Sequence, residues 1–200
     1  SRHPEDSNTG NSIVDNAISL LDSASIQTGE IRFFNEETLL LQRYRYTILD
    51  NLSKADFDRS FSLVYQPKVR ISDRRCTGAE ALIRWHDEQF GDVSPSVFIP
   101  MAEQTGFIRK ITRWVIRRCV ADIEAMWKAE GELSKDLTFS INLSVADLRD
   151  KGLVDFLTRE VLLVPGIARA IEFEITEGIM LDEDTMVKRN LSHLQGAGFK

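Results

Sequence analysis

The stretch GAEALIRWHDEQFG, residues 78–91, decides the fold class because two kinds of side chain alternate along it. Successive side chains of a β-strand point to opposite faces of the sheet. One face of this strand carries an acid, an aliphatic residue and a base, which are Glu80, Leu82 and Arg84. The opposite face is apolar and consists of Ala79, Ala81, Ile83 and Trp85. The apolar face suits a core, whereas a purely structural strand has no reason to bury the mixed face. We therefore expect the mixed face to border a functional site.

The composition is that of a globular chain whose net charge does not favour nonspecific binding to nucleic acid, although it leaves room for a local basic site. Of the 200 residues, 42% are hydrophobic and 28% are charged, and the formal net charge is -6. This charge argues against nonspecific binding to DNA, RNA or an anionic membrane. No apolar run approaches the roughly 18 residues of a membrane span, and no signal peptide is visible. Cys76 and Cys119 are expected to be reduced thiols, so we expect a cytoplasmic protein, unless regions outside this chain anchor it to a membrane.

Strand-like and helical patterns alternate after about residue 60. Strands are predicted at 61–67, 77–85, 137–144 and 170–176, and helices at 107–129, 152–163 and 183–196. Strands that alternate with helices of this length indicate an α/β fold with a parallel sheet. The preceding segment, residues 1–59, is predicted to contain a helix at 13–24, a short strand at 31–34 and a helix at about 36–53. We therefore expect two parts, 1–59 and 60–200. Phe199 and Lys200 resemble the approach to a further strand.

Polar side chains on three predicted strands can meet at one end of such a sheet. Asn142 lies on the polar face of strand 137–144, and Glu174 on the polar face of strand 170–176. In a (β/α)8 barrel the ends of the inner strand faces form the active site at the C-terminal mouth, where Glu80 would join these two residues. Carboxylate and amide oxygens suit Mg²⁺ or Mn²⁺, and Arg84 could hold a phosphate in a bidentate fork. This combination favours metal-assisted phosphoester chemistry. The alternative is a structural ion pair between Glu80 and Arg84.

Six motifs in order make the chain similar to the EAL family of cyclic di-GMP phosphodiesterases. They are YQP at 65–67, GAEALIRW at 78–85, SPSVFIPMAEQTGFI at 94–108, WVIRRC from Trp114, INLS at 141–144 and EFEITE at 172–177. The resemblance covers about 140 residues, from Phe61 onward. It implies a TIM-barrel-like (β/α)8 domain, of which this chain would hold about the first half. The implied reaction opens cyclic di-GMP to linear pGpG with Mg²⁺ or Mn²⁺.

The resemblance also implies roles for individual residues. Glu80, Asn142 and Glu174 match metal-binding positions, and Arg84 matches an arginine that contacts a substrate phosphate. Gln66 and Leu82 match positions that line the nucleotide site, and Glu177 matches a glutamate that supports a loop beside the metals. Two departures stand out. Asp87 and Glu88 replace a frequent His-Pro pair, and the paired aspartates, the lysine near the attacking water and a later glutamate would lie beyond Lys200, so the catalytic residues are not assigned within this chain.

The resemblance leaves two matters open. Residues 2–24 and 29–37 resemble the last helix and strand of a GGDEF-like domain, but a private N-terminal extension is the alternative. A catalytically inactive EAL module that binds cyclic di-GMP or a protein partner is the alternative to an enzyme. For the full-length protein, the family implies a homodimer and a regulatory domain before this chain.

Overall fold

The computed structural model describes residues 36–131, 136–175 and 184–200, and the described residues belong to two units that divide after Lys54. In the first unit, helix α2 (Glu36–Lys54) matches the helix predicted at 36–53. The predicted helix at 13–24 and the strand at 31–34 lie outside the described residues.

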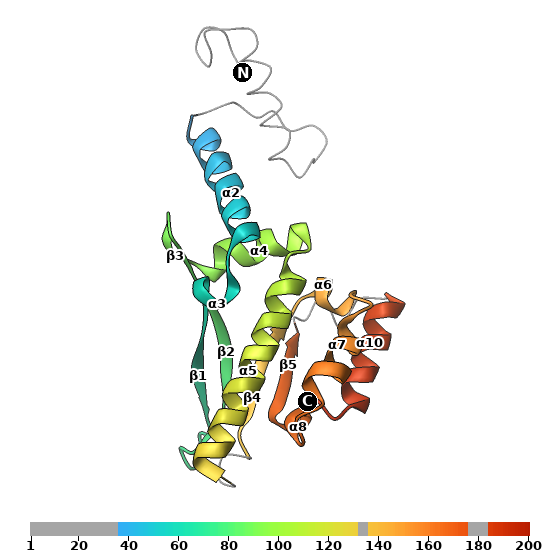
Figure 1. The fold of residues 1–200 in the computed structure, drawn as a ribbon. Helices are drawn as coiled ribbons and strands as arrows, with labels where there is room; N and C mark the ends of the chain where they lie inside the picture. The colour runs from blue at the N-terminus through green and yellow to red at the C-terminus, as the bar shows by residue number, and fades with distance from the viewer. Residues whose placement is uncertain (1–35, 132–135, 176–183) are drawn as a thin grey trace, which may run out of the picture. The chain divides into compact units, whose positions relative to one another are not determined.

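A mixed sheet forms the centre of the second unit (Figure 1). Its strand order is β1-β2-β4-β5, and the short β3 pairs with the free part of β2. The strands are β1 (Phe61–Val69), β2 (Cys76–Asp87), β3 (Gly91–Val93), β4 (Thr138–Leu143) and β5 (Ile171–Ile175).

The prediction of a parallel sheet is right for part of these strands only. The β2–β4 and β4–β5 pairs are parallel, but β1 is antiparallel to β2. The length of the loop between β1 and β2 explains the antiparallel direction. Residues 70–75 between β1 and β2 form a short hairpin loop, and a parallel pair needs a crossover of a dozen residues or more.

Within the described residues, helices follow the strands as the α/β pattern predicts, with four additions and one difference. Helices α5 (Ile108–Glu130) and α10 (Thr185–Gly196) confirm the helices predicted at 107–129 and 183–196. The helix predicted at 152–163 is instead α7 (Leu153–Phe156) followed by a π-helical turn, Leu157–Val161. This wider turn leaves both Leu157 and Val161 buried. Three of the additions are the short helices α3 (Phe57–Ser60), α6 (Val145–Leu148) and α8 (Ile167–Ala170).

Helix α4 (Pro95–Thr105) was hidden in the sequence by its two prolines. Pro95 stands at the start of the helix, where its missing N–H costs nothing, and Pro100 lies inside it. The helix ends at Gly106, whose φ of 73° is the left-handed conformation that favours glycine. The motif SPSVFIPMAEQTGFI is thus a capped helix that leads into α5.

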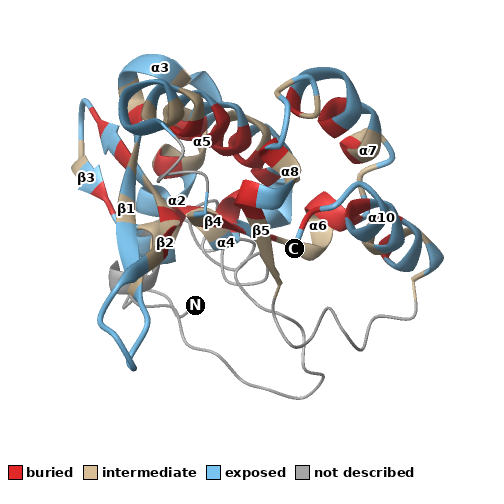
Figure 2. Ribbon diagram, turned by 90° about the horizontal axis from the view of Figure 1, so that it is seen from below, coloured by how far each residue is buried: buried red, intermediate tan, exposed pale blue. Residues whose placement is uncertain are grey.

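The core lies between the sheet and α5, as Figure 2 shows by the buried residues along the helix. Ala79, Ala81 and Trp85 of β2 are buried, which confirms the apolar face predicted from alternation. Helix α5 contributes Ile111, Ile116 and Ile123, which are at most 2% exposed. The hydroxyl of Tyr65 on β1 donates to Asp122 Oδ2 on α5 at 2.8 Å. The opposite face of the sheet is thereby left for the polar series.

The free edge of β5 is bonded to the last residue of the chain. The N–H of Phe173 donates to the carbonyl of Lys200 at 2.8 Å, and the N–H of Lys200 donates to the carbonyl of Ile171 at 3.2 Å. Phe199 is buried and its ring lies 5.1 Å from that of Phe173. The predicted strand-like approach at 199–200 is therefore observed. No helix in the described ranges has the length and apolarity needed to cross a membrane.

Candidate functional site

The strand registers bring the polar residues of four strands onto one face of the sheet. Gln66 of β1 lies opposite Glu80 of β2, and Glu80 is paired in turn with Ser140 of β4. Asn142, two residues further along β4, is paired with Glu174 of β5. The side chains predicted to meet do therefore share one face, from neighbouring strands.

Glu80 and Asn142 touch each other directly. The amide nitrogen Nδ2 of Asn142 donates to Glu80 Oε1 at 2.7 Å. Asn142 is exposed and Glu80 is half-buried. Because the amide nitrogen faces the carboxylate, the amide oxygen of Asn142 and the second carboxylate oxygen of Glu80 are not used in this hydrogen bond and keep their acceptor capacity.

Glu174 is bonded to a lysine that the sequence did not single out. Lys68 Nζ lies 2.5 Å from Glu174 Oε1, and it also donates to the hydroxyl of Ser140, which is fully buried. The hydrogen bond from Lys68 holds the pKa of Glu174 below its usual range. The bond to Glu174, with the charges of Glu172 and Glu80 nearby, raises the pKa of Lys68. The sequence did contain a signal for Lys68. Residues 66 and 68 of one strand must share a face, so alternation places Lys68 on the same face as Gln66.

Arg84 lies at the outer end of the polar face and is exposed. Its Nη1 donates to the carbonyl of Ile83 at 2.9 Å. Across the described ranges it makes no ion pair, so the alternative of a structural Glu80–Arg84 pair finds no support there. The guanidinium keeps further N–H groups that a phosphate could accept.

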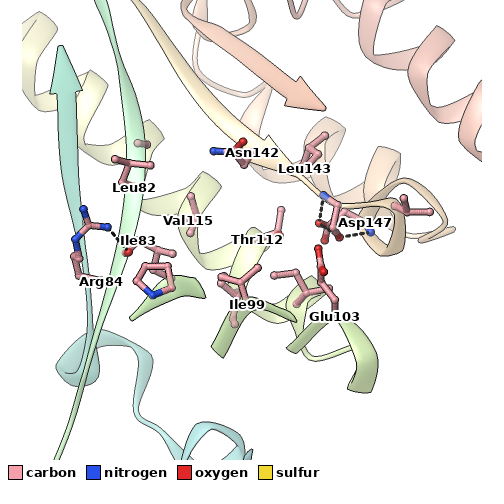
Figure 3. Close-up of a pocket in the computed structure, with 16 residues that line it drawn as sticks. Leu82, Ile83, Arg84, Ile99, Glu103, Thr112, Val115, Asn142, Leu143 and Asp147 are labelled. Atoms are coloured by element: carbon pink, nitrogen blue, oxygen red, sulfur yellow. Dashed lines mark hydrogen bonds between the residues drawn. The ribbon is translucent and has the colours of Figure 1, made fainter. Parts of the chain in front are cut away.

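A cavity of about 510 Å³ opens beside Arg84 and Asn142 (Figure 3). Leu82 lines it too, so three of the residues selected from sequence border this space. Its other walls come from α4, α5 and the start of α6, and include Ile99, Glu103, Thr112, Val115 and Asp147. The cavity lies where β2 and β4 have separated, because their pairing ends at Glu80 and Ser140. It offers a mostly apolar space with a few charged groups at its rim.

Asp147 is the buried carboxylate of this cavity wall. It is 2% exposed and accepts from Ser144 N at 2.9 Å and from the Ser144 hydroxyl at 2.6 Å, which completes a capping box at the start of α6. Burial raises the pKa of Asp147, against the hydrogen bonds from Ser144 and Thr112.

The remaining predicted positions are less informative. Gln66 is exposed and Leu82 half-buried, both on the polar face. Glu177 lies outside the described residues, so its role stays a prediction.

Asp87, at the departure from the frequent His-Pro pair, is buried. Its Oδ1 accepts from the N–H groups of Gln89 and Phe90 at 2.9 and 3.0 Å, which builds the turn between β2 and β3. The loop conformation is therefore stabilised without the proline.

The donor atoms on this face fit a small divalent cation. Glu80, Asn142 and Glu174 supply hard oxygen ligands from neighbouring strands, the set that Mg²⁺ and Mn²⁺ prefer. Within the described residues no group of three or more His, Cys, Asp and Glu side chains is gathered in a metal-binding arrangement, so Glu80 and Glu174 are the two carboxylates of this candidate set. Lys68 already supplies one positive charge to this set.

The fold and the polar face together define a barrel-type α/β domain with an acidic, arginine-edged inner face. Comparison with known proteins assigns this domain to a family. The model of the EAL domain matches residues 49–200, and the chain belongs to this family.

Named relatives agree with this membership. A cyclic di-GMP phosphodiesterase of Pseudomonas aeruginosa is 36% identical over 147 residues, which cover 73% of this chain and 24% of that protein. The biofilm architecture maintenance protein MbaA of Vibrio cholerae is 35% identical over 157 residues, which cover 78% of this chain and 19% of that protein. The chain thus spans about a quarter of these relatives or less.

Solved structures show the same fold. The PaMucR phosphodiesterase in its c-di-GMP complex is 30% identical, with a TM-score of 0.68 over 76% of this chain and 61% of that one. An EAL enzyme bound to cAMP and cyclic di-GMP is 26% identical, with a TM-score of 0.66 over 82% of this chain and 44% of that one. The expected TIM-barrel-like EAL fold is therefore confirmed.

Proposed function

We propose that this chain is part of a cyclic di-GMP phosphodiesterase that hydrolyses the dinucleotide to linear pGpG with Mg²⁺ or Mn²⁺. The observation that carries the proposal is the shared face of Glu80, Asn142 and Glu174, with Arg84 two strand positions beyond Leu82. Relatives named for this activity or bound to this dinucleotide support it.

The residues have separate tasks in this proposal. Glu80, Asn142 and Glu174 would hold the cation, which would supply a metal-activated water as nucleophile and stabilise the leaving 3′-oxygen. Arg84 binds the scissile phosphate through charge-assisted hydrogen bonds and fixes its orientation. Leu82 excludes water beside the bound nucleotide, and Gln66 offers an amide to its polar edge.

The second candidate is an inactive EAL module that binds cyclic di-GMP as a receptor. The Lys68–Glu174 ion pair is the observation that favours it, because an ammonium at a candidate metal ligand could stand in for the metal. The two candidates differ in whether metal and turnover are required, which one experiment separates.

The experiment is turnover of cyclic di-GMP by the full-length protein, followed by chromatography of pGpG with Mg²⁺ and with EDTA. We expect turnover in Mg²⁺ alone, and we expect Glu80→Ala to lower it by at least about 100-fold, since even partners of metal ligands are worth about 10–100-fold. The fold should persist, because Glu80 lies on the open polar face and not in the core. The control is Glu130→Ala, at the exposed end of α5. Near-normal turnover by Glu80→Ala would refute the ligand assignment, and binding without turnover by the unaltered protein would support the receptor.

A further inference from the structure

Lys68 is a cation built into the polar face at the place where the proposed function needs a metal. Its ammonium donates to Glu174 and to Ser140, side chains of two different strands, and its own strand is a third. Neither the alternation of the strands nor the six motifs give this residue a task.

The strand register explains how a residue of β1 reaches β5. Lys68 lies opposite Gly78 of β2, on the face that Glu80 occupies two residues later. Glycine has no side chain, so the lysine stem can extend over β2 toward β4 and β5. Ser140, paired with both Glu80 and Glu172, then lies directly in its path.

The charges around the ammonium do not balance. Glu80, Glu172 and Glu174 all interact electrostatically with Lys68. Three carboxylates and one ammonium leave a net charge of about -2 on this face when all four are ionised. That remainder equals the charge of one divalent cation.

A metal at Glu174 and the ammonium compete for the same carboxylate. Two cations on one side chain repel each other, and the repulsion is strong where water is partly excluded. Lysine can retreat, because its charge sits at the end of a flexible four-carbon stem and its side chain is 36% exposed. Glu172 offers a second acceptor two residues earlier on the same face of β5.

We propose that Lys68 is an exchangeable counter-cation, which pairs with Glu174 in the metal-free protein and leaves that carboxylate when a divalent cation binds. The proposal rests on the proposed function in one respect, namely that Glu174 is a metal ligand. Lys68 then stabilises the acidic face without metal and sets a threshold that the metal concentration must exceed.

The first test measures Mn²⁺ affinity by calorimetric titration of the full-length protein. Lys68→Met keeps the length of the stem and removes the charge, so it should tighten Mn²⁺ binding by about 5–10-fold, whereas Lys68→Arg should stay near the unaltered value. In EDTA, Lys68→Met should melt about 2–4 °C lower, because three carboxylates then face each other unpaired. Lys128→Met, at an exposed position of α5, is the matched control for both measurements. Unchanged or weaker Mn²⁺ binding by Lys68→Met would overturn the proposal.

The second test needs no substitution at Lys68 and so does not depend on how a variant folds. An amine-acylating reagent is applied to the unaltered protein in EDTA and in Mn²⁺, and modified peptides are quantified by mass spectrometry. Mn²⁺ should raise the acylation of Lys68 several-fold and leave that of Lys128 unchanged. Equal or lower acylation of Lys68 in Mn²⁺ would overturn the proposal.

A single further variant separates this inference from the proposed function. If Glu174→Gln binds Mn²⁺ as tightly as the unaltered protein, the metal assignment of the proposed function fails, and the exchange fails with it. If Glu174→Gln loses Mn²⁺ while Lys68→Met shows no gain, only the counter-cation proposal fails.

Discussion

Among single residues, Arg84 and Asp147 border the same cavity but are held in opposite ways. Arg84 is exposed, and its guanidinium donates a hydrogen bond to the backbone carbonyl of Ile83. Asp147 is buried and bound by the capping box of α6. A group with free donors is suited to bind a ligand, whereas one whose acceptors are occupied is suited to hold a backbone in place.

Arg84→Ala should weaken the binding of cyclic di-GMP by about 1.5–3 kcal/mol, the typical value of hydrogen bonds to a charged group. Calorimetric titration of the full-length protein in Ca²⁺ measures this, since Ca²⁺ coordinates more loosely than Mg²⁺ and should permit binding without turnover. Arg169→Ala, exposed on α8, is the control and should bind normally. An affinity unchanged by Arg84→Ala would leave the arginine without a role at the phosphate.

Asp147 predicts a pH dependence of stability. Its pKa in the folded protein lies above the ordinary value of 3.8, so the folded state binds the proton more tightly than the unfolded state. Stability relative to Asp147→Asn should therefore rise as pH falls through the folded pKa, and the gain should be complete below about 3.8. Denaturant midpoints of both proteins between neutral pH and about pH 3.5 check this. A difference that does not change with pH would contradict the expected shift.

At the scale of elements, local sequence patterns correctly predicted which face of a strand each side chain occupies. They did not predict strand direction or the contacts between residues far apart in the sequence. Alternation placed Ala79 and Trp85 in the core and Glu80 on the polar face, because strand parity is fixed by the backbone itself. The antiparallel direction of β1 and the helix α4 were missed, since a hairpin and a proline-containing helix depend on chain geometry that periodicity does not record. Lys68 was missed for a similar reason. Its partners, Ser140 and Glu174, are more than 70 residues away in the sequence.

For the candidate site, the strand residues that share a face could be derived from alternation, and their roles came from the family motifs. What neither source contained is how the charges divide between partners. Asn142 bonds Glu80, whereas Glu174 bonds Lys68. Such a division follows from strand order and register, which are tertiary properties.

Gly78→Ala should separate β2 from β4 and destabilise the domain by about 1–3 kcal/mol or more. A Cβ at Gly78 would lie 1.9 Å from the carbonyl oxygen of Thr138, and this is backbone, which cannot turn aside. Urea denaturation of the full-length protein measures the loss. The control is Gly196→Ala on α10, where nothing lies within 4 Å and where alanine should be neutral or stabilising. Equal stability of Gly78→Ala and the unaltered protein would show that the two strands are less closely joined than described.

At the scale of the whole molecule, the described sheet is open. Strand β1 has β2 as its neighbour on one side, and β5 is followed by the backbone of Lys200. A closed barrel of this class has eight strands, and its site is assembled from the ends of several of them. The chain covers 61% of the PaMucR phosphodiesterase chain. The described strands therefore form only part of the wall of such a barrel.

We expect residues 1–200 alone to be unable to hydrolyse cyclic di-GMP. Open strand edges and uncovered apolar side chains such as Val64, which is 41% exposed on β1, favour association or partial unfolding. The proposed metal set would also be small, because Glu80, Asn142 and Glu174 would give three protein ligands, whereas each Mg²⁺ takes about six oxygens.

The test compares this polypeptide with one that is about 100 residues longer, which approaches the length of a complete barrel of this class. Light scattering reports association, thermal melting reports cooperativity, and pGpG formation reports activity. Monomeric, cooperative and active behaviour is expected of the longer polypeptide only, because only there can the strands close on one another and complete the ligand set. A monomeric and active 200-residue polypeptide would mean that four strands of the wall suffice, and the requirement for a closed barrel would have to be abandoned.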